Sequence, residues 1–405
     1  MKYKVLKDIC EIVNGYAFKS KDFTDAGIPV IKIKNVKPNK IILDGLTYVP
    51  KEIAEKRSDY LIKVNDILLT MTGNRADGSP DSWVGKSAIF KDGGRYLLNQ
   101  RVAIIRPKSD EVDVEYLSYY LSSWATQLYF IKRANSSGGQ ANISPAIVGE
   151  YEIPIPELGI QKKIAGILSV LDEKIRINDK INENLEQQIE TILLKTIDNA
   201  NTQPVKLGDY LYIKGRIGWK GLKKSEYLPV SDYRIINGES LTLSGIDWNK
   251  AGYISAERYE ESPEIMLNIG DILLSKDGTI GKIGYVDKLE TPTSVASGIF
   301  VIRNTRQAEI STQFIYYLLK SRLFKAFITS RTEGSVIPHL YQKDFTEFEF
   351  QLPSPDDMKT FDDTTAAMFS MVFSNLNENE RLIHLRDSLL PKLMSGELDI
   401  SGIEI

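Results

Sequence analysis

Hydrophobic residues repeat every seven positions through one long stretch of the chain, from Glu157 to Asn199. After Gly166 the stretch contains no Gly or Pro, and it is rich in residues that lose little rotamer freedom in a helix. A repeat kept over four heptads predicts a coiled-coil helix, and about 40 residues would span roughly 60 Å. Each of its two columns has one asparagine among apolar residues: Ile164, Leu171, Asn178, Leu185 and Ile192, and Leu168, Ile175, Asn182 and Ile189.

A second stretch with the same pattern lies near the C-terminus, from Pro355 to Leu398. Its apolar column again contains one asparagine, and it consists of Phe361, Met368, Asn375, Leu382 and Leu389. An offset of 197 residues relates Asn178 to Asn375, and the same offset relates Glu183 to Glu380 and Lys195 to Lys392. Either stretch alone could be an ordinary core helix. The shared offset instead favours a duplicated spacer helix.

The two remaining regions, residues 1–156 and 201–354, share one order of patterns. Each contains a β-rich turn, NDILLTMTG or GDILLSKDG, then a strand pattern, LLNQRVAIIRP or VASGIFVIRN, and then an amphipathic helix. In the first region GIPVIKIKNVK alternates apolar residues with lysines, which predicts a strand with a basic open face. VEYLSYYLSSWATQLYF predicts one helix, and SSGGQANISPA predicts a flexible polar loop.

The sequence therefore predicts an α+β protein with an internal repeat. Two globular domains, 1–156 and 201–354, alternate with two spacer helices, 157–200 and 355–405, the latter including a C-terminal tail. The chain returns along the second helix, so we expect the helices to pack as an antiparallel coiled coil with a pseudo-twofold axis. Asn178 and Asn375 lie near the helix midpoints, so we expect their amides to face each other there and fix the register. The alternative is that both amides point to solvent.

Charge is distributed unevenly. The net charge is −3, but residues 157–199 carry −2 and residues 356–405 carry −6, so the rest of the chain carries +5. Mildly basic globular regions are compatible with DNA binding, although a chain this weakly basic would need a partner to hold DNA at cellular salt. Cys10 is the single cysteine, which excludes an internal disulfide and fits the cytoplasm. We expect no signal peptide, no membrane span and no structural zinc site.

These features together resemble the specificity subunit of a type I restriction–modification system. The strongest carriers are the segment GGQANISPAIVGEYEIPIPELGIQKKIAGILSVLDEKIRINDKINENLEQ and the paired NDILL and GDILL turns. The copy of the first segment at 335–398 is degenerate, since Ile337, His339 and Tyr341 replace Gln140, Asn142 and Ser144. The resemblance covers essentially the whole chain.

The resemblance implies that each globular domain recognises one half of a split, asymmetric site in double-stranded DNA. It implies that the two helices set the gap between the half-sites and dock modification subunits, which methylate adenine with S-adenosylmethionine. A restriction subunit would join them as the nuclease. The chain itself would hold no cofactor and would not be a catalyst.

The sequence also contains fragments that mimic catalytic motifs. Gly85-Lys86-Ser87 resembles the end of a phosphate-binding loop, but position 80 is Pro where that motif needs Gly. Asp356 and Asp357 resemble part of a nuclease signature, yet they stand where a helix start favours Asp. Two other hypotheses remain open: a free-standing DNA-modifying enzyme, and a structural coiled-coil adaptor.

Candidate DNA contacts follow from side-chain chemistry. Arg and Lys recognise guanine, Asn and Gln recognise adenine, and Lys, Arg, Ser and Thr contact phosphates. His384 lies in the second helix pattern and is expected to be packed or solvated. In the first domain the candidates are Lys32, Lys34, Lys37, Asn74, Arg75, Ser136, Ser137 and Gln140. In the second domain they are Lys214, Arg216, Trp219, Lys220, Lys223, Lys224, Lys276, Thr279, Arg331 and His339.

Overall fold

A computed structural model describes residues 2–74, 82–137, 140–199, 204–217, 221–332, 340–400 and 402, with only the backbone described at 136, 137, 224 and 332. The chain divides into two compact units. Unit 1 comprises Met1–Arg176 with Asn379–Ile405, and unit 2 comprises Ile177–Glu378. Each unit therefore contains one globular region together with a segment of both long helices.

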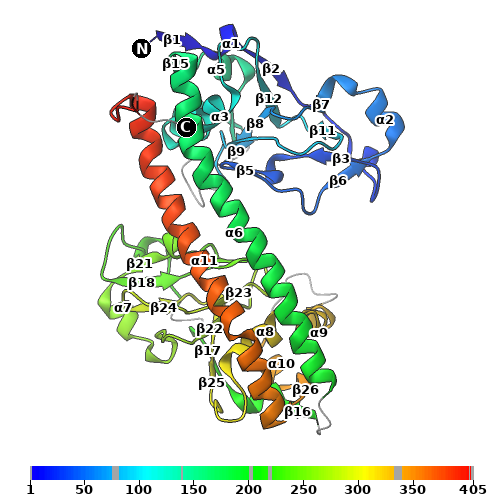
Figure 1. Cartoon of the computed structure of the whole chain (residues 1–405), viewed down its shortest axis with the longest axis vertical. Helices are drawn as coiled ribbons and strands as arrows, with labels where there is room; N and C mark the ends of the chain where they lie inside the picture. Colours follow the sequence, from blue (N-terminus) through cyan, green and yellow to red (C-terminus); the bar gives the residue numbers. More distant parts are fainter. Residues whose placement is uncertain are drawn as a thin grey trace. The chain divides into compact units, whose positions relative to one another are not determined.

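The centre of unit 1 is a four-stranded antiparallel sheet in the order β10-β8-β12-β2, and Figure 1 labels its strands β2, β8 and β12. Its strands are β2 (Cys10–Asn14), β8 (Ile67–Thr70), β10 (Ser87–Ile89) and β12 (Val102–Pro107). Every residue of β8 is buried, as are the first four residues of β12. A short, continuous apolar run is the sequence pattern of such a buried strand, so the two strands expected here are confirmed.

A second sheet of unit 1 has the order β6-β3-β11-β7 and contains one parallel pair, β3 with β11. Its strands are β3 (Ile28–Ile31), β6 (Thr47–Val49), β7 (Leu61–Ile62) and β11 (Tyr96–Leu98). β9 (Thr72–Gly73), β14 (Gln140–Asn142) and β13 (Asn135–Ser137) form a three-stranded ribbon. Two further pairs join β1 (Lys2–Val5) to β15 (Glu152–Ile155) and β4 (Val36–Lys37) to β5 (Lys40–Ile41).

The basic strand predicted over residues 27–37 is found only in part. β3 covers Ile28–Ile31 and β4 covers Val36–Lys37, and the 3-10 turn η2 (Ile33–Asn35) separates them. The side chain of Asn35 explains the break, because its Oδ1 accepts the Lys32 N–H at 3.0 Å and its Nδ2 donates to the Ile42 carbonyl at 3.0 Å. Side-chain to backbone bonds of this kind offer the chain an alternative to a strand.

The helix predicted after β12 is in fact two helices, α3 (Val114–Ser122) and α4 (Trp124–Arg133). Ser123 separates them, because its extended backbone ends α3 and its hydroxyl accepts the Thr126 N–H at the start of α4. The predicted flexible loop that follows is also partly ordered, since it contributes β13, β14 and part of α5 (Pro145–Gly149). The short helices α1 (Leu6–Ile9) and α2 (Lys51–Glu55) and the 3-10 turns η1 (Ser20–Asp22) and η3 (Ser58–Tyr60) complete unit 1.

Unit 2 repeats the strand order of unit 1. The antiparallel sheet β23-β22-β25-β17 matches the central sheet, and β21-β18-β24 matches the second sheet, including one parallel pair. The strands are β16 (Pro204–Lys206), β17 (Leu211–Gly215), β18 (Tyr233–Ile236), β19 (Leu241–Thr242), β20 (Gly245–Ile246), β21 (Gly252–Ile254), β22 (Ile272–Ser275), β23 (Ile283–Tyr285), β24 (Thr293–Val295), β25 (Ile299–Asn304) and β26 (Glu349–Gln351).

The helices of unit 2 follow the same plan. They are α7 (Ala256–Glu260), α8 (Thr312–Lys320), α9 (Arg322–Thr332) and α10 (Gln342–Thr346), with the 3-10 turns η5 (Leu207–Tyr210), η7 (Lys224–Glu226), η8 (Trp248–Lys250) and η9 (Pro263–Ile265). Aromatic and aliphatic side chains of α8 form one core cluster with residues of the central sheet and of both long helices. The globular part of unit 2 therefore packs on the helix segments that belong to it.

The NDILL and GDILL turns have a structural explanation. Asp66 is 1% exposed, accepts the Lys63 N–H at 2.7 Å and binds Arg106 through Nε at 2.7 Å and Nη2 at 2.8 Å. In unit 2, Asp271 binds Arg303 in the same bidentate way, at 2.7 and 3.0 Å. A buried carboxylate needs such a partner. Each aspartate therefore stabilises the turn before the central strand, which is a structural role and not a catalytic one.

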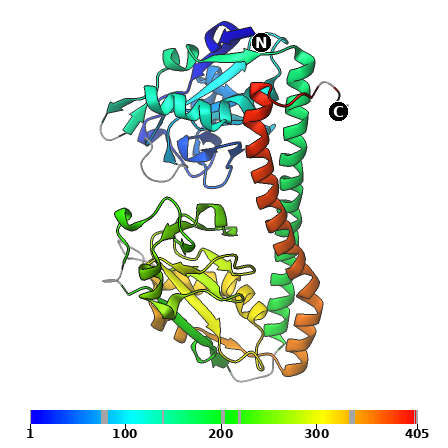
Figure 2. The same cartoon turned by 90° about the vertical axis from the view of Figure 1, so that its left-hand side faces the viewer.

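The two long helices are α6 (Leu158–Asp198) and α11 (Pro355–Ser395), each of 41 residues. Within unit 1, Ile164 and Leu168 of α6 share a buried cluster with Leu390 and Leu393 of α11. Within unit 2 the two helices lie side by side (Figure 2), and residues of both enter the core. Both helices were predicted within a few residues of these bounds.

The predicted pairing of Asn178 with Asn375 is not the arrangement observed. Asn375 Nδ2 donates to Asn182 Oδ1 at 2.8 Å, and Asn178 Nδ2 donates to Glu378 Oε2 at 2.8 Å. Asn182 also donates to the Val372 carbonyl at 3.2 Å. As residue numbers rise from 178 to 182 along α6, the residue numbers of the partners on α11 fall from 378 to 375 and 372. These segments of the two helices therefore run antiparallel. The predicted midpoints agree with the bounds of both helices, but the contacts between the helices are centred about half a turn beyond these midpoints, which makes Asn182 rather than Asn178 the partner of Asn375.

Among the described residues, no helix combines the length and the hydropathy that a membrane span requires.

Candidate nucleic-acid interface

The β9-β14-β13 ribbon of unit 1 gathers candidate residues from three separate segments. Gly73 pairs with Ala141, and Ser137 pairs with Gln140, so Asn74 and Gln140 stand at the same end of the ribbon. Both side chains are exposed. The hydroxyl of Thr72 donates to Asn142 Oδ1 at 2.7 Å and ties the strands together. This end of the ribbon presents amide groups of the kind that can recognise adenine.

The remaining candidates on this ribbon are only partly described. The backbones of Ser136 and Ser137 lie in β13, whereas Arg75 lies outside the described residues. Asn74 donates from Nδ2 to the Ser82 hydroxyl at 3.1 Å, and its backbone forms an isolated bridge with Trp83. Ser82 and Trp83 therefore lie beside Asn74.

An exposed tryptophan beside the ribbon was missed by the sequence reasoning. Trp124, the first residue of α4, is 52% exposed, and its ring centroid lies 5.3 Å from that of Trp83. Since Trp83 bridges to Asn74, this aromatic pair flanks the amide end of the ribbon. The sequence signal was weak, because a tryptophan in an amphipathic helix is usually assigned to the core.

The three candidate lysines of unit 1 lie in the chain between β3 and β5. Lys32 is half-buried, and its Nζ lies 3.5 Å from the centroid of the Phe23 ring. Burial lowers the pKa of Lys32, and the neighbouring Lys34 lowers it further. Lys34 is exposed but donates to the Gly45 carbonyl at 2.8 Å. Lys37 pairs with Lys40 across β4 and β5, so this pair offers the more accessible charge.

A short turn between the first two sheets of unit 1 carries two exposed lysines, Lys19 and Lys21, that the sequence reasoning also missed. The Lys19 N–H donates to Asp22 Oδ2 at 2.8 Å and so closes the turn. At the equivalent position in unit 2, the Lys223 N–H donates to Glu226 Oε2 at 2.7 Å. The sequences FKSKDF and LKKSEY share a pattern that could have revealed this turn. In each, a lysine lies three residues before an acidic residue, and an apolar residue flanks this segment on either side.

Among the unit 2 candidates, Arg216 is only 3% exposed. Its guanidinium donates to the Val295 carbonyl at 3.2 Å, to the Ser294 hydroxyl at 3.3 Å and to the Arg258 carbonyl at 3.4 Å. Burial lowers the pKa of Arg216, and the charge of Arg258 lowers it further. A direct contact between Arg216 and DNA does not fit this position. The basic run in the sequence could not reveal that one of its members turns inward.

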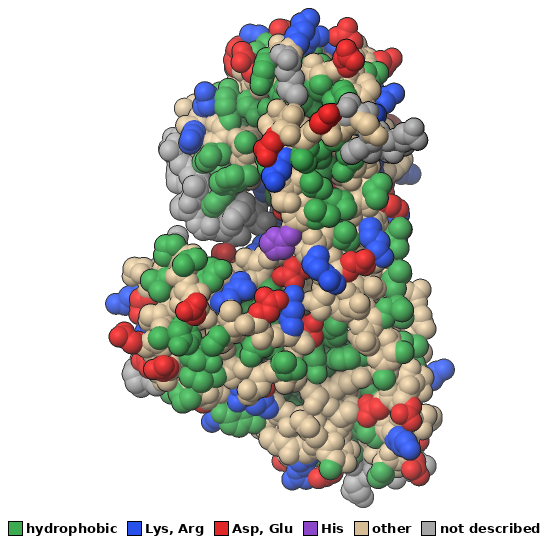
Figure 3. All heavy atoms as spheres, turned by 60° about the vertical axis from the view of Figure 1, so that its left-hand side comes forward, with side chains coloured by type: hydrophobic (Ala, Val, Ile, Leu, Met, Phe, Trp, Pro, Cys, Tyr) green, Lys and Arg blue, Asp and Glu red, His purple; other side chains and the backbone are tan. Residues whose placement is uncertain are grey.

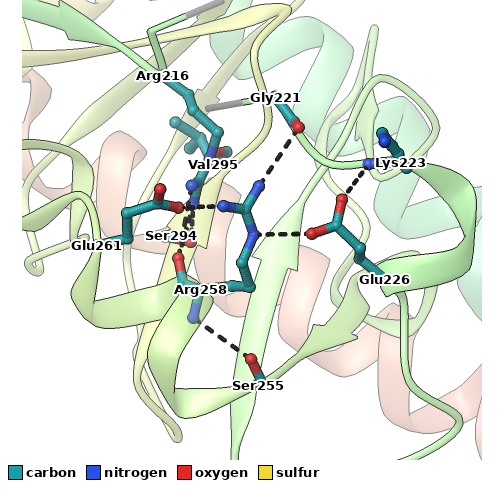
Figure 4. Close-up of polar contacts among 9 residues, drawn as sticks. All are labelled: Arg216, Gly221, Lys223, Glu226, Ser255, Arg258, Glu261, Ser294 and Val295. Carbon is teal, nitrogen blue, oxygen red and sulfur yellow. Dashed lines mark hydrogen bonds and ion pairs between the residues drawn. The ribbon is translucent and has the colours of Figure 1, made fainter. Parts of the chain in front are cut away.

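The neighbouring Arg258 was not a candidate, yet it is the centre of a polar network (Figure 4). Its Nε binds Glu226 Oε1 at 3.1 Å, its Nη2 donates to the Gly221 carbonyl at 3.3 Å, and its Nη1 binds Glu261. The network joins α7 to the turn that carries Lys223, whose own side chain is exposed. Lys224 belongs to that turn by its backbone, whereas Trp219 and Lys220 lie outside the described residues.

The other candidates of unit 2 come from three elements. Lys214 is exposed on β17, and Thr279 is exposed in the loop after β22. Lys276 binds Asp277 at 2.9 Å, and its carbonyl accepts the Leu340 N–H at 3.1 Å. His339 lies outside the described residues. Arg331 on α9 binds Glu347 at 2.8 Å.

The charge on the surface is mixed. Figure 3 shows Lys and Arg side chains interspersed with Asp and Glu on the visible face of each unit. Among the residues that the structure describes, no group of three or more His, Cys, Asp or Glu could hold a metal ion. Asp357, which resembles part of a nuclease motif, lies in the first turn of α11, where its N–H donates to the Ser354 hydroxyl at 3.2 Å. Interaction with a polyanion would therefore depend on individual lysines and amides rather than on a uniformly basic face.

Comparison with known proteins gives a consistent result. The sequence profile described as "Type I restriction modification DNA specificity domain" matches residues 1–187 and again 199–383. The type I restriction enzyme MjaIX specificity subunit of Methanocaldococcus jannaschii is 26% identical over 99% of this chain and 94% of its own length. The type I restriction enzyme EcoBI specificity subunit of Escherichia coli is 23% identical over 97% of this chain and 85% of its own.

Similarity of fold is also found with a solved structure. The crystal structure of the S subunit of a type I restriction–modification system from M. genitalium superimposes with a TM-score of 0.52 at 18% identity, covering 97% of this chain and 95% of that one.

Proposed function

The chain belongs to the family of type I restriction–modification DNA specificity proteins and supplies DNA sequence specificity, and we propose that it does so through two separate half-sites. The globular region of unit 1 reads one half of a split, asymmetric site in double-stranded DNA, and that of unit 2 reads the other. The observation that carries this proposal is the duplication. Two copies of one fold keep their strand order, while the side chains at the candidate interface differ.

In unit 1 the amides of Asn74 and Gln140 are the candidates for base recognition, because Asn and Gln pair with adenine in the major groove. Lys37, Lys19 and Lys21 are exposed or half-exposed and are candidates for phosphate contacts. In unit 2, the exposed Lys214, Lys223 and Thr279 take the same roles. The remaining candidates predicted from the sequence, which are paired, partly buried or outside the described residues, are weaker proposals: Lys32, Lys34, Arg75, Ser136, Ser137, Trp219, Lys220, Lys224, Lys276, Arg331 and His339.

We further propose that α6 and α11 form the antiparallel coiled coil predicted from the heptads. This coiled coil would set the gap between the half-sites and dock the modification subunits. S-adenosylmethionine would bind to those subunits, and cleavage would belong to a restriction subunit, so this chain is non-catalytic. The domain bounds follow the repeat: 1–156 and 201–354 recognise DNA, and 157–200 and 355–405 are spacers.

Methylation mapping tests the central claim. Genomic DNA from cells that express the chain with its modification partner is sequenced for modified adenine. We expect one split motif with a fixed gap of unspecified bases and two unlike halves. A continuous or palindromic motif would contradict recognition by two different domains. Exchanging residues 201–354 for another such domain should change one half of the motif and leave the other unchanged.

The spacing role of the helices has its own test. Inserting four residues after Glu183 adds about one helical turn, roughly 6 Å. We expect the half-sites to lie about one turn of DNA apart in the wild type, and the insertion to lengthen the tolerated gap. An unchanged gap would show that α6 does not set the spacing, while leaving the two-domain proposal intact.

A further inference from the structure

Units 1 and 2 contain the same acid-closed turn at the same place in their folds. In unit 1 it runs from Lys19 to Asp22, between β2 and β3, and in unit 2 from Lys223 to Glu226, between β17 and β18. In both, the acid accepts the lysine N–H, at 2.8 and 2.7 Å. The turn therefore presents an exposed lysine, which suits a phosphate contact without base preference.

The two turns are supported in different ways. In unit 1, Phe18 and Phe23 flank the turn, and they pack in an apolar cluster that includes Ile53 of α2. Strand β6 of unit 1 is equivalent to β21 of unit 2. Counting onward from the ends of these two strands, the residue of unit 2 equivalent to Ile53 is Arg258 of α7. An aliphatic side chain under one turn is thus replaced by a guanidinium under the other.

The Arg258 guanidinium contacts the unit 2 turn at both ends. It binds the Glu226 carboxylate at 3.1 Å, and its Nη2 donates at 3.3 Å to the carbonyl of Gly221, two residues before Lys223. The same carboxylate closes the turn through the Lys223 N–H. Glu261 binds the third nitrogen and holds the side chain in place. The planar guanidinium suits this task, since its donors point in fixed directions.

Arg258 is in turn held by the core of unit 2. Its carbonyl accepts hydrogen bonds from the buried Arg216, which also binds Ser294 and Val295 at strand β24. Its own N–H donates to the Ser255 hydroxyl at the start of α7, at 3.3 Å. A continuous set of hydrogen bonds and ion pairs therefore links strand β24 to the turn (Figure 4).

We propose that Arg258 is a positioning residue for DNA recognition by unit 2: it fixes the turn Lys223–Glu226 so that the exposed Lys223 ammonium meets a DNA phosphate. The inference rests on the proposed function, because it assumes that unit 2 reads a half-site. Arg258 itself is engaged with two carboxylates and a carbonyl, so it acts through the turn and not on DNA.

The test uses the full chain assembled with its modification subunits and two DNA duplexes. One duplex carries the mapped site, and the other has the half-site of unit 2 scrambled. Arg258→Met should weaken binding to the intact duplex about tenfold, as loss of one charge-assisted contact does, and binding to the scrambled duplex by a similar factor, because a phosphate contact has no base preference. Lys223→Met should cause a similar loss. Arg258→Lys keeps the charge but cannot span both ends of the turn, so it should recover only part of the affinity.

The double variant distinguishes positioning from direct contact. If Arg258 acts through the turn, Arg258→Met combined with Lys223→Met should bind about as well as either single variant. Additive losses of about a hundredfold would show that Arg258 contacts DNA itself and would overturn the proposal, as would unchanged binding by Arg258→Met. Should thermal unfolding show that Arg258→Met does not fold, Glu226→Gln weakens the same ion pair, and unchanged binding by that variant would equally overturn it.

A control variant in unit 1 and the behaviour of the wild-type complex distinguish failure of this inference from failure of the proposed function. Ile53→Met alters the equivalent position in unit 1 with little change in volume and should leave recognition by unit 2 unchanged. Failure of the wild-type complex to distinguish the intact duplex from the scrambled one would refute the proposed function. The inference about Arg258 fails alone if the wild type distinguishes them and the variants behave like it.

Discussion

Units 1 and 2 attach their globular regions to the long helices at equivalent positions but with different chemistry. In unit 1 the Tyr119 hydroxyl donates to Asp172 of α6 at 2.7 Å. The offset of 197 residues relates this pair to Tyr316 and Phe369 of unit 2, whose ring centroids lie 6.1 Å apart. A hydrogen bond to a carboxylate in one unit is thus replaced by an edge-to-face aromatic contact in the other.

A second pair of positions shows the same contrast. Gln161 of α6 is fully buried, accepts the Asp113 N–H at 2.9 Å and donates to the carbonyls of Glu111 and Pro156 at 2.9 and 2.8 Å. Its counterpart at the same offset, Met358 of α11, is buried in the main apolar cluster of unit 2. The contrast shows that the topology of the junction does not depend on one kind of interaction.

The difference also has a consequence for assembly. A buried amide without partners costs about 1–3 kcal/mol, so the segment of α6 around Gln161 is poorly suited to the apolar junction of unit 2. Met358 would in turn leave the backbone groups of the unit 1 junction without partners. Each helix segment is therefore matched to its own globular region, which opposes exchange between the two copies of the repeat.

The largest effect is expected at the apolar junction. Phe361 of α11 is 1% exposed, and its ring centroid lies 5.0 Å from that of Phe314. Phe361→Ala should lower the free energy of unfolding of unit 2 by about 3–5 kcal/mol, because it leaves a cavity in the core. Hydrogen exchange should show faster opening of β17 and β25 than of their unit 1 counterparts. Equal loss of protection in both units would mean that they do not unfold separately.

The polar junction should be nearly as sensitive. Gln161→Leu is close in volume but leaves one buried N–H and two carbonyls without their partner, so we expect a loss of about 2–3 kcal/mol in unit 1. Denaturant unfolding measures it. Met358→Leu, the matched change in unit 2, should cost less than about 1.5 kcal/mol. If the two variants lost the same amount, the hydrogen bonds of Gln161 would not be what stabilises the junction of unit 1.

Much of this fold was predictable because heptads and buried strands leave strong periodic signals. α6, α11 and the strands β8 and β12 follow from apolar spacing alone. What failed depends on single side chains that bond to the backbone. Asn35 breaks the expected basic strand, and Ser123 divides the expected helix.

The candidate interface was predicted less well, for a related reason. Residue type indicates what a side chain can bind, but not whether it faces solvent. Arg216 lies in a basic run yet points into the core, whereas Arg258 gave no signal because its role arises from contact with a turn more than 30 residues earlier. Lys19 became a candidate only when the two units could be compared element by element.

A smaller effect is expected where the two helices meet within unit 2. Asn182→Leu removes the acceptor for the Asn375 amide and should cost about 1 kcal/mol, with a broader distribution of gaps between methylated half-sites. Changing both residues to Leu should recover the stability, because no amide is then left without a partner, but should not recover the gap. Thermal unfolding and methylation mapping measure the two properties. A double variant less stable than the single one would contradict this account.

The smallest effect at neutral pH concerns Cys10, at the start of β2, where the equivalent strand β17 of unit 2 begins with Leu211. Burial raises the pKa of the Cys10 thiol from 9.0 to about 12, and Lys108 offsets this only in part. Below pH 8 the thiol is protonated in the folded and unfolded chains alike. Between pH 9 and 12 the unfolded chain releases the proton and the folded chain does not, so the stability of unit 1 falls as pH rises.

Comparison with Cys10→Ala isolates this contribution, since all other titrating groups are common to the two proteins. The difference in unfolding free energy between wild type and variant should be constant up to pH 8. By pH 9.5 the wild type should have lost roughly 0.8 kcal/mol relative to the variant. The corresponding change Leu211→Ala in unit 2 should give a difference that does not vary with pH, because leucine does not titrate. A flat difference for Cys10→Ala as well would mean that the thiol reaches water in the folded protein.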